Sequence, residues 1–354
     1  MDRVIVLAGG FATRLRPLSY TRPKPLFPIL GKPLIDWILE RAKDIAPVVI
    51  SARYLADMIK SHIAARWNGA SVVEEGRPLG DGGAVAYIAD MLSLSSVMAI
   101  NGDVFTDMDL KAVAEYHKRK GGAATIAFVE VPAESLSKYG VGVMDDSLRL
   151  VDFVEKPKEP PAGSRLANAG VYIFEEEALR EIPRRPGEVK IAKDVMPALL
   201  KKYDVYVYVH KGIWLDIGTP QDYLRANFVA LDSFGSTAPR GAEVVPPVYI
   251  AEDAEVGRGA VVGPYAVVGP GSRIGEYARV RNSVLMGRAY VESGAYISGS
   301  IIGDDAYVGK WARVMEAAVA DGVYIRDEVY VGRGASIGPN REVAEDVPEG
   351  ATLP

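Results

Sequence analysis

The sequence predicts two folded domains: an α/β domain built on a mostly parallel sheet and, after it, a parallel β-helix. Two observations lead to this fold class. Strand-like apolar runs alternate with helical segments through the first two thirds of the chain, and from Tyr249 onward an aliphatic residue recurs about every six positions. The 354 residues are enough for two hydrophobic cores. We place the first domain at 1–233, a linker at 234–247 and the β-helix at 248–354.

The composition excludes several classes of function. The net charge is −5, which argues against a general electrostatic surface for nucleic acid, and no apolar run approaches the ~18 residues of a membrane helix. Because no leader pattern precedes the first strand, we expect a cytoplasmic protein with no nucleic-acid or membrane partner. The absence of cysteine excludes disulfides and thiolate chemistry, and three histidines are too few for a multi-histidine metal site. A single glutamine and six asparagines favour a thermophilic source.

The elements of the first domain follow one another at short intervals. Hydrophobic periodicity predicts strands at 4–7, 48–50, 70–73, 97–100, 123–131, 150–154 and 205–209, and helices at 33–42, 55–67, 84–91 and 110–118. In a parallel sheet, ligands bind at the carboxyl ends of the strands. The loops that follow these strands are therefore the first candidates for a binding site.

The loop after the first strand, 7–19 followed by 22–26, has the character of a phosphate site. Gly9 and Gly10 let the backbone approach an anion and direct N–H groups at it, and Arg14 and Lys24 add positive charge. The glycine spacing fits neither the dinucleotide-binding fingerprint nor the Walker A loop. The loop therefore predicts phosphate binding without identifying the ligand.

Two aspartates stand at informative positions. Asp103 follows the apolar strand 97–100, where a carboxylate can hold Mg²⁺ against phosphates, although an Asx turn also explains it. Asp216 lies in the apolar run 212–217, and burying a lone carboxylate costs several kcal/mol unless it is paired or bound to a metal. The loop 74–85, which precedes both aspartates in the sequence, has four glycines; this suggests close backbone approach to a flat ligand or simply a flexible helix start.

A six-residue period dominates the C-terminal third of the chain. Small residues stand two positions before many of the aliphatic ones, and glycine often follows them. Such hexads stack aliphatic side chains inside a triangular β-helix. The predicted inward positions are Ile250, Val256, Val262, Val268, Ile274, Val280, Met286, Val291, Ile297, Ile302, Val308, Val314, Val319, Ile325, Val331, Ile337 and Val343.

The glycine-rich loop resembles the signature of the sugar-nucleotide pyrophosphorylases, nucleotidyltransferases that make NDP-sugars. That signature reads approximately Gly-Gly-x-Gly-Thr-Arg-Leu-x-Pro-Leu-Thr, then Pro-Lys-Pro-Leu. This chain departs from it at Ala12, where the family usually has glycine, and at Ser19, where it has threonine. The resemblance implies a Rossmann-like catalytic domain, a Mg²⁺ cofactor, and an NTP and a sugar 1-phosphate as substrates.

The resemblance also implies roles for individual residues. Arg14, Lys24 and Lys156 would be catalytic, and Asp103 and Asp216 would hold the metal. The nucleotide would contact Leu7, Gly9, Gly10, Thr13, Arg14, Glu75 and Gly80, with Glu75 and Gly80 near the base. The sugar phosphate would contact Gly140, Glu155, Lys156 and Asn168.

The hexads resemble the left-handed coil of mannose-1-phosphate guanylyltransferases in particular, notably at 300–303, 308–314 and 327–331. We therefore expect GTP and mannose 1-phosphate as substrates, with glucose 1-phosphate and dTTP or UTP as the alternative. A catalytically silent relative that binds NDP-sugar or another protein is the alternative of another class. Acetyl transfer is not expected, because all three histidines precede the coil. The expected assembly is a homo-oligomer, with the coil as the candidate interface.

Overall fold

The computed structural model describes residues 1–239 and 243–354; the predicted linker 234–247 therefore includes three residues outside the described ones. The chain divides into two compact units, one of residues 1–10 and 35–215 and one of residues 11–34 and 216–354. The segment 11–34 thus groups with the C-terminal residues. The domain boundaries given above stay a prediction.

The first unit is built on a mixed nine-stranded sheet in the order β10-β9-β11-β6-β1-β4-β5, with β8 between β11 and β12. Strands β5, β4, β1 and β6 run parallel, as do β8 and β12, whereas β11 is antiparallel to its neighbours β6, β8 and β9. The antiparallel β9–β10 pair is joined by a short turn, which only antiparallel strands can use. The strands are β1 Arg3–Ala8, β4 Val48–Ala52, β5 Ala70–Glu74, β6 Ser96–Asn101, β8 Ala124–Glu130, β9 Gly140–Met144, β10 Leu150–Glu155, β11 Leu166–Glu175 and β12 Val205–His210.

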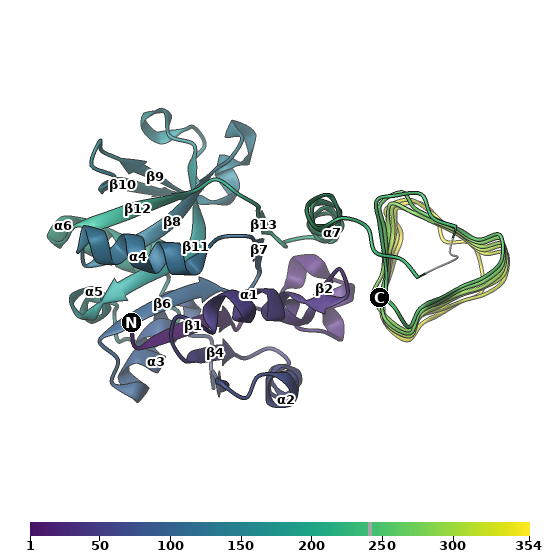
Figure 1. Cartoon of the computed structure of the whole chain (residues 1–354), viewed down its shortest axis with the longest axis horizontal. Coiled ribbons are helices and arrows are strands. Elements are labelled where there is room, and N and C mark those ends of the chain that lie inside the picture. Colours follow the sequence, from purple (N-terminus) through teal and green to yellow (C-terminus); the bar gives the residue numbers. More distant parts are fainter. Residues whose placement is uncertain (240–242) are drawn as a thin grey trace. The chain divides into compact units, whose positions relative to one another are not determined.

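Helices cover this sheet (Figure 1), and the predicted α/β class is confirmed. Buried residues of α3, α5 and α6 form one core with alternate residues of the strands. The intervening strand residues, such as Val4 and Val6, are also buried, so the opposite face is covered as well. The helices are α1 Leu34–Ala42, α2 Ala56–Arg66, α3 Gly80–Leu92, α4 Leu110–Lys120, α5 Glu176–Glu181 and α6 Met196–Lys202, the last preceded by the π-helical turn η6 Ile191–Val195. Two short strands, β7 Val104–Thr106 and β13 Trp214–Asp216, pair beside the sheet. Within the described residues, no helix is long and apolar enough to cross a membrane.

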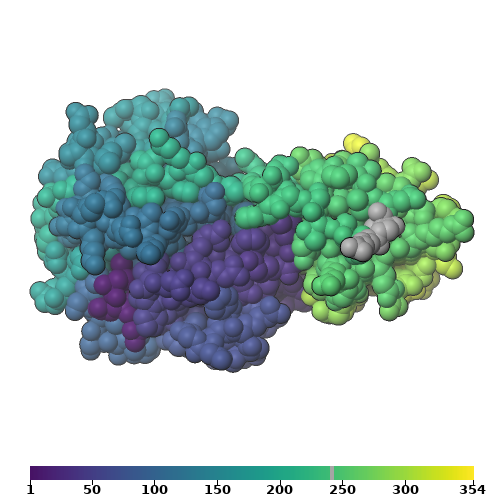
Figure 2. Space-filling model, viewed as in Figure 1, coloured from purple at the N-terminus to yellow at the C-terminus, as the bar shows by residue number. Residues whose placement is uncertain are grey.

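The second unit begins with the segment 11–34, which contains three 3-10 turns and a small hairpin. The turns are η1 Thr13–Leu15, η2 Leu18–Tyr20 and η3 Lys24–Leu26, and the hairpin strands are β2 Pro28–Ile29 and β3 Lys32–Pro33. Helix α7 (Pro220–Phe234) fixes this hairpin: the Tyr223 hydroxyl donates to the Pro28 carbonyl over 2.6 Å, and Asn227 Oδ1 accepts from Leu30 N over 3.0 Å. Figure 2 shows the purple surface of the N-terminal segment meeting the green surface of α7 and the first coil residues.

The rest of the second unit is a parallel β-helix, seen along its axis as a triangle in Figure 1. Its short strands form three parallel sheets, in the orders β14-β17-β20-β23-β26-β29-β31, β15-β18-β21-β24-β27-β30 and β16-β19-β22-β25-β28. This arrangement is consistent with the left-handed coil that the resemblance implied. The strands are β14 Val248–Ile250, β15 Glu255–Val256, β16 Val261–Val262, β17 Ala266–Val268, β18 Arg273–Ile274, β19 Arg279–Arg281, β20 Ser283–Leu285, β21 Tyr290–Val291, β22 Tyr296–Ser298, β23 Ile301–Ile302, β24 Tyr307–Val308, β25 Arg313–Met315, β26 Ala318–Val319, β27 Tyr324–Ile325, β28 Tyr330–Val331, β29 Ser336–Ile337, β30 Glu342–Val343 and β31 Thr352–Leu353.

The core of the coil follows the hexad prediction with one correction. The predicted aliphatic positions are buried in or packed against one continuous core, except Met286, whose place in the core is taken by Leu285. The ladder pairs Val268 with Leu285 and Leu285 with Ile302. The one-residue slip therefore comes before this position, at the corner where Asn282 adopts a left-handed conformation (φ 48°), and not after it.

Candidate active site

The glycine-rich loop turns sharply at Ala12, which has φ 49° and ψ 40°. This left-handed conformation costs an L-residue roughly 1–2 kcal/mol and costs glycine little, which explains why glycine is usual at this place in the signature. Two donors hold the Ala12 carbonyl: Leu15 N at 3.0 Å and the Ser19 hydroxyl at 2.8 Å. Serine at position 19 keeps the hydroxyl of the usual threonine, so neither departure removes the turn.

Arg14 and Lys24 both lie against Asp216 in the second unit. Lys24 Nζ is 3.2 Å from Asp216 Oδ1, and Arg14 Nη2 is 4.0 Å from Asp216 Oδ2. Gly218 makes room for the guanidinium, because a Cβ there would lie 3.1 Å from both Arg14 Nη atoms. Asp216 is therefore not the lone carboxylate suggested by its apolar sequence neighbours, since its side chain is 23% exposed and has two cationic neighbours. The Arg14 side chain is 69% exposed and can reach a ligand. Thr13 begins the turn η1 beside it.

In the first unit, Gly9 and Glu75 lie together. A Cβ at Gly9 would be 2.6 Å from Glu75 Oε1, so only glycine fits against this buried carboxylate. Glu75 Oε1 accepts from the Ser51 hydroxyl at 2.8 Å, and its Oε2 accepts from Leu79 N at 3.4 Å. Gly10 differs, because nothing lies within 4 Å of the place a Cβ would occupy. Gly9 thus allows close packing against Glu75, whereas the space beside Gly10 is open.

Gly80 and Asp81 fix the start of α3. Gly80 has φ 75°, and a Cβ there would collide with the Val189 carbonyl. Asp81 Oδ1 accepts from Gly82 N and Ile191 N, each at 2.8 Å, and so ties α3 to η6. Burial raises the pKa of Asp81 despite these hydrogen bonds, which by themselves would lower it. Asp81 therefore has a structural role at the start of α3.

Asp103 lies in the turn between β6 and β7. The preceding residue, Gly102, donates its N–H to the Leu7 carbonyl at 2.8 Å, and a Cβ there would lie 2.8 Å from that oxygen. The turn that carries half-buried Asp103 is thereby fastened to the end of β1. Asp109 accepts from Ala112 N at 3.0 Å and caps α4, whereas the Asp107 carboxylate contacts His210 Nε2 at 2.9 Å.

The donor set fits Mg²⁺ shared with substrate phosphates. Among residues 1–239 and 243–354, no three acidic or histidine side chains gather closely enough to hold a metal ion by themselves. Mg²⁺ is commonly bound by only one or two carboxylates together with substrate phosphates and water. Asp103 in the first unit and Asp216 in the second each carry carboxylate oxygens, the kind of ligand that Mg²⁺ prefers.

The residues expected at the sugar phosphate come from three neighbouring strands. A Cβ at Gly140 would collide with the Phe153 ring and lie 2.9 Å from Glu155 Oε2, so glycine at this position makes room for both side chains of β10. Lys156 is exposed, with its Nζ 3.9 Å from Glu155 Oε1. In β11, Ala167 pairs with Val141 of β9, and Asn168 is the next residue. Asn168 Nδ2 donates to the Tyr172 hydroxyl at 2.7 Å. The hairpin thus brings Gly140, Glu155, Lys156 and Asn168 to one end of the sheet.

Sequence reasoning gave no role to Arg22 and Ser51. Ser51 sits at the end of β4 and orients Glu75. Arg22, two residues before Lys24, contacts aspartates of the coil. The sequence contains one signal for this contact. Asp304 and Asp321 are 17 residues apart, and many residues that pair between adjacent turns of the coil have this spacing.

Comparisons with known proteins identify the family of the chain. The family model "Nucleotidyl transferase" matches residues 3–233, and the model "GMPPB C-terminal domain" matches residues 244–353. The chain is 40% identical to a putative mannose-1-phosphate guanyltransferase of Sulfolobus acidocaldarius over 73% of this chain and 74% of the relative. It is 33% identical to mannose-1-phosphate guanylyltransferase 1 of Arabidopsis thaliana over 98% of each chain. It is 35% identical to the Drosophila melanogaster catalytic subunit beta of that enzyme, over 98% of this chain and 96% of the relative.

Among solved structures, HddC from Yersinia pseudotuberculosis complexed with GMP-PN matches with a TM-score of 0.53 and 28% identity, over 66% of this chain and all of HddC. The chain belongs to the nucleotidyl transferase family, and it is an enzyme that transfers a nucleotidyl group. Within that family it is a sugar-1-phosphate nucleotidyltransferase, similar to the mannose-1-phosphate guanylyltransferases over almost its whole length.

Proposed function

We propose that this enzyme is a Mg²⁺-dependent mannose-1-phosphate guanylyltransferase, which makes GDP-mannose and pyrophosphate from GTP and mannose 1-phosphate. The carrying observation is the cluster of Arg14, Lys24 and Asp216, in which two cations and a carboxylate meet beside the glycine-rich loop. The names of the relatives support the choice of mannose and guanine.

In this reaction a phosphate oxygen of the sugar 1-phosphate attacks the α-phosphorus of the nucleotide, the new O–P bond forms, and the bond to the β-phosphate oxygen breaks. No covalent enzyme intermediate is required, so the protein acts by positioning and by offsetting charge. Arg14 and Lys24 offset the charge that develops on departing pyrophosphate. Lys156, exposed beside Glu155, orients the attacking phosphate.

Asp103 and Asp216 would hold Mg²⁺. The chemistry supplied there would be neutralisation of part of the phosphate charge. Residues of the chain itself bind and orient the nucleotide. Leu7, Gly9, Gly10 and Thr13 shape the nucleotide loop, and the open space at Gly10 suits close approach of a phosphate.

Glu75 and Gly80 are proposed to lie near the base. A carboxylate suits the N–H donors on the guanine N1/N2 edge, which supports GTP over dTTP or UTP. The sugar is proposed to contact the Gly140 backbone, Glu155 and Asn168. The Asn168 side chain already has Tyr172 and Gly170 as partners, so it presents its contact in a fixed orientation.

One assay tests this function directly: pyrophosphate release across a panel of NTPs and sugar 1-phosphates with Mg²⁺. We expect the fastest release with GTP and mannose 1-phosphate. Preference for glucose 1-phosphate with dTTP or UTP would replace the substrate assignment but keep the chemistry. Failure to release pyrophosphate with any pair would overturn the assigned reaction and favour a silent, regulatory relative.

Asp216→Asn tests the residue that carries the proposal. The amide keeps the shape of the side chain but removes the charge facing Lys24, Arg14 and the metal, so turnover should fall by about two orders of magnitude or more. Steady-state kinetics and a melting curve measure activity and folding. The control Asp146→Asn changes an exposed turn residue and should leave turnover unchanged. Turnover by Asp216→Asn close to that of the unmodified enzyme would remove Asp216 from the metal site.

We further propose that the enzyme forms a homo-oligomer through a groove on the coil. This groove, of about 690 Å³, is lined by aromatic and arginine residues that include Tyr277, Arg279, Tyr296, Trp311 and Arg313. The Trp311 side chain is 62% exposed and Tyr277 is 57% exposed. Tryptophan, tyrosine and arginine are the residues most enriched at the energetic centres of protein interfaces, and the groove therefore suits a second copy of the coil.

A further inference from the structure

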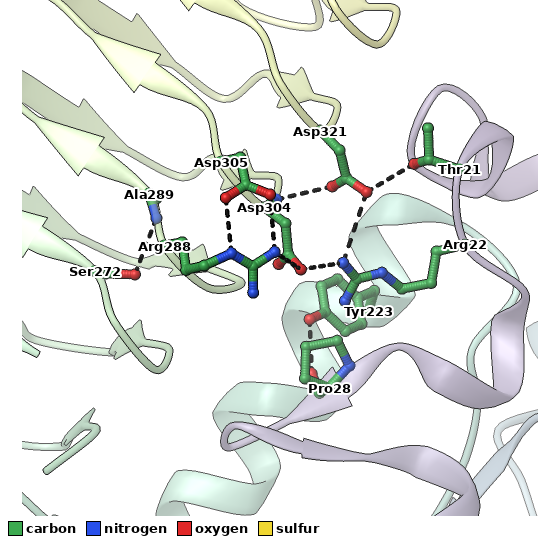
Figure 3. Close-up of polar contacts among 10 residues, drawn as sticks. All are labelled: Thr21, Arg22, Pro28, Tyr223, Ser272, Arg288, Ala289, Asp304, Asp305 and Asp321. Atoms are coloured by element: carbon green, nitrogen blue, oxygen red, sulfur yellow. Dashed lines mark hydrogen bonds and ion pairs between the residues drawn. The ribbon is translucent and has the colours of Figure 1, made fainter. Parts of the chain in front are cut away.

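The segment 11–34 contacts the coil through one polar cluster (Figure 3). Arg22 Nη2 lies 2.6 Å from Asp304 Oδ2 and 3.6 Å from Asp321 Oδ2. The hydroxyl of neighbouring Thr21 donates to the same Asp321 oxygen at 2.7 Å. Two consecutive residues of the segment are thus held by two carboxylates of the coil.

The coil presents these carboxylates in a fixed position. Asp321 Oδ1 accepts from the Asp304 backbone N–H at 2.8 Å, which joins two adjacent turns. A Cβ at Gly303 would collide with Asp321, so glycine there leaves the space that this carboxylate occupies. From the preceding turn, Arg288 Nη2 contacts Asp304 Oδ2 at 3.2 Å and its Nε donates to Asp305 Oδ1 at 2.7 Å. Three turns of a rigid coil therefore set the geometry before Arg22 is added.

Arg22 is held tightly as well. Its side chain is only 13% exposed, and burial alone would lower its pKa, but the charges of Asp304 and Asp321 outweigh burial and raise it. Arg22 therefore stays charged at every physiological pH. A guanidinium forked between two fixed carboxylates defines both the position and the direction of the backbone that carries it.

The chain leads from Arg22 through Pro23 to Lys24, the residue whose Nζ lies 3.2 Å from Asp216 Oδ1. Because proline restricts both itself and the residue before it, there is little backbone freedom between the two cations. The far end of the segment is fixed separately, by Tyr223 and Asn227 of α7. The carboxylates of the coil thus fasten the middle of the segment, two residues before Lys24.

We propose that Asp304 and Asp321 of the β-helix are positioning residues for catalysis, which act through Arg22 to hold Lys24 where pyrophosphate binds and leaves. This inference rests on the proposed function, because it assumes that Lys24 contacts pyrophosphate. It gives the coil a part in the reaction of each single chain, apart from any part in assembly. The alternative is an ion-pair cluster that only stabilises the fold.

Kinetics of the reverse reaction distinguish a positioning role of the cluster from a purely structural one. Pyrophosphate and GDP-mannose are both substrates in that direction, and only pyrophosphate depends on Lys24. In Asp304→Asn we expect the KM for pyrophosphate to rise about tenfold, because small displacements of a positioned group have effects of this size or larger. The KM for GDP-mannose should change less than twofold. Assays are run well below the melting temperature of each variant, so that loss of folded protein does not enter.

Two further variants complete the design. Asp305→Asn is the matched control, since Asp305 lies at the same corner but contacts Arg288 and neither Arg22 nor Thr21; its pyrophosphate KM should not change. Asp321→Asn is the milder change, because asparagine Oδ1 can still accept from Asp304 N, and we expect about a threefold rise. If Asp304→Asn does not fold, the pyrophosphate KM of Asp321→Asn alone tests the inference.

Unchanged pyrophosphate KM in both Asp304→Asn and Asp321→Asn, with or without a lower melting temperature, overturns the inference. An equal rise in the KM of both substrates also overturns it, because it indicates a general structural effect. If the unmodified enzyme turns over in neither direction, the proposed function itself has failed, and this result is distinct from the other two.

Discussion

Ala12 is the residue at which this chain departs most informatively from its family signature. Its left-handed backbone strains any side chain, and the bonds from Leu15 and Ser19 to its carbonyl hold it there. The cost of the added methyl group is therefore conformational and involves no clash that would block the loop. A sequence shows the substitution, but only the φ angle shows why glycine is preferred.

Ala12→Gly should therefore stabilise the protein modestly. Relief of about 1–2 kcal/mol of strain exceeds the roughly 0.4–1 kcal/mol by which glycine stabilises the unfolded chain. We expect a net gain of up to about 1 kcal/mol in the free energy of unfolding, measured by denaturant titration. The control Ala64→Gly, on the exposed side of α2, should destabilise by about 1 kcal/mol, because its backbone is helical. Equal destabilisation by both changes would contradict this account of the loop.

At the scale of elements, the start of α3 depends on a buried acid. Asp81 accepts from two backbone N–H groups and joins α3 to η6, but burial raises its pKa. The folded protein therefore binds the Asp81 proton more tightly than the unfolded chain does. The contribution of Asp81 to stability is greatest below its unfolded pKa, and it declines as pH rises through the raised folded value.

Asp81→Asn should remove this decline. The asparagine oxygen can accept the same two hydrogen bonds and brings no charge to bury. We expect the melting temperature of the variant to rise relative to the unmodified protein as pH increases from the acid range, and the difference then to level off. Melting curves from pH 4 to 8 measure it. The control Asp146→Asn, at an exposed turn position, should show no such pH-dependent difference. A constant difference across this range would count against the buried charge as its cause.

For the whole molecule, we propose two roles for the coil: it is an assembly surface, and it supports the segment 11–34. These roles use different faces of it, because the groove around Trp311 shares no residue with the cluster of Asp304, Asp321 and Arg288. A change in the groove can therefore alter assembly without touching the residues that hold Arg22.

Trp311→Glu places a charge at the centre of the proposed interface between copies. The oligomer should dissociate at least about tenfold more readily, since central aromatic residues carry a large share of interface energy. Analytical ultracentrifugation over a concentration series measures the change. Tyr87→Glu, a comparably exposed aromatic position on α3, is the control and should leave the assembly intact. A monomeric unmodified protein, or identical sedimentation of Trp311→Glu, would contradict the proposal.

The α/β class, the coil and the family could all be predicted from the sequence, because each depends on patterns that are local along the chain. A six-residue period, a glycine-rich loop after a strand, and acids at strand ends are visible without coordinates. One prediction in the coil was wrong: Met286 was assigned to the core position that Leu285 occupies. The two aliphatic residues are adjacent and fit the six-residue period equally well, and only the pairing of Leu285 with Val268 and Ile302 distinguishes them. The roles given to the individual site residues stay predictions.

The contacts between charged residues could be identified only in the folded structure. Asp216 read as a lone buried acid, yet Arg14 and Lys24, about 200 residues earlier in the chain, lie beside it. Arg22 had no assigned role until the coil brought Asp304 and Asp321 to it. The physical reason is that an ion pair depends on distance in space, and contacts between residues hundreds of positions apart leave no periodic trace in one sequence.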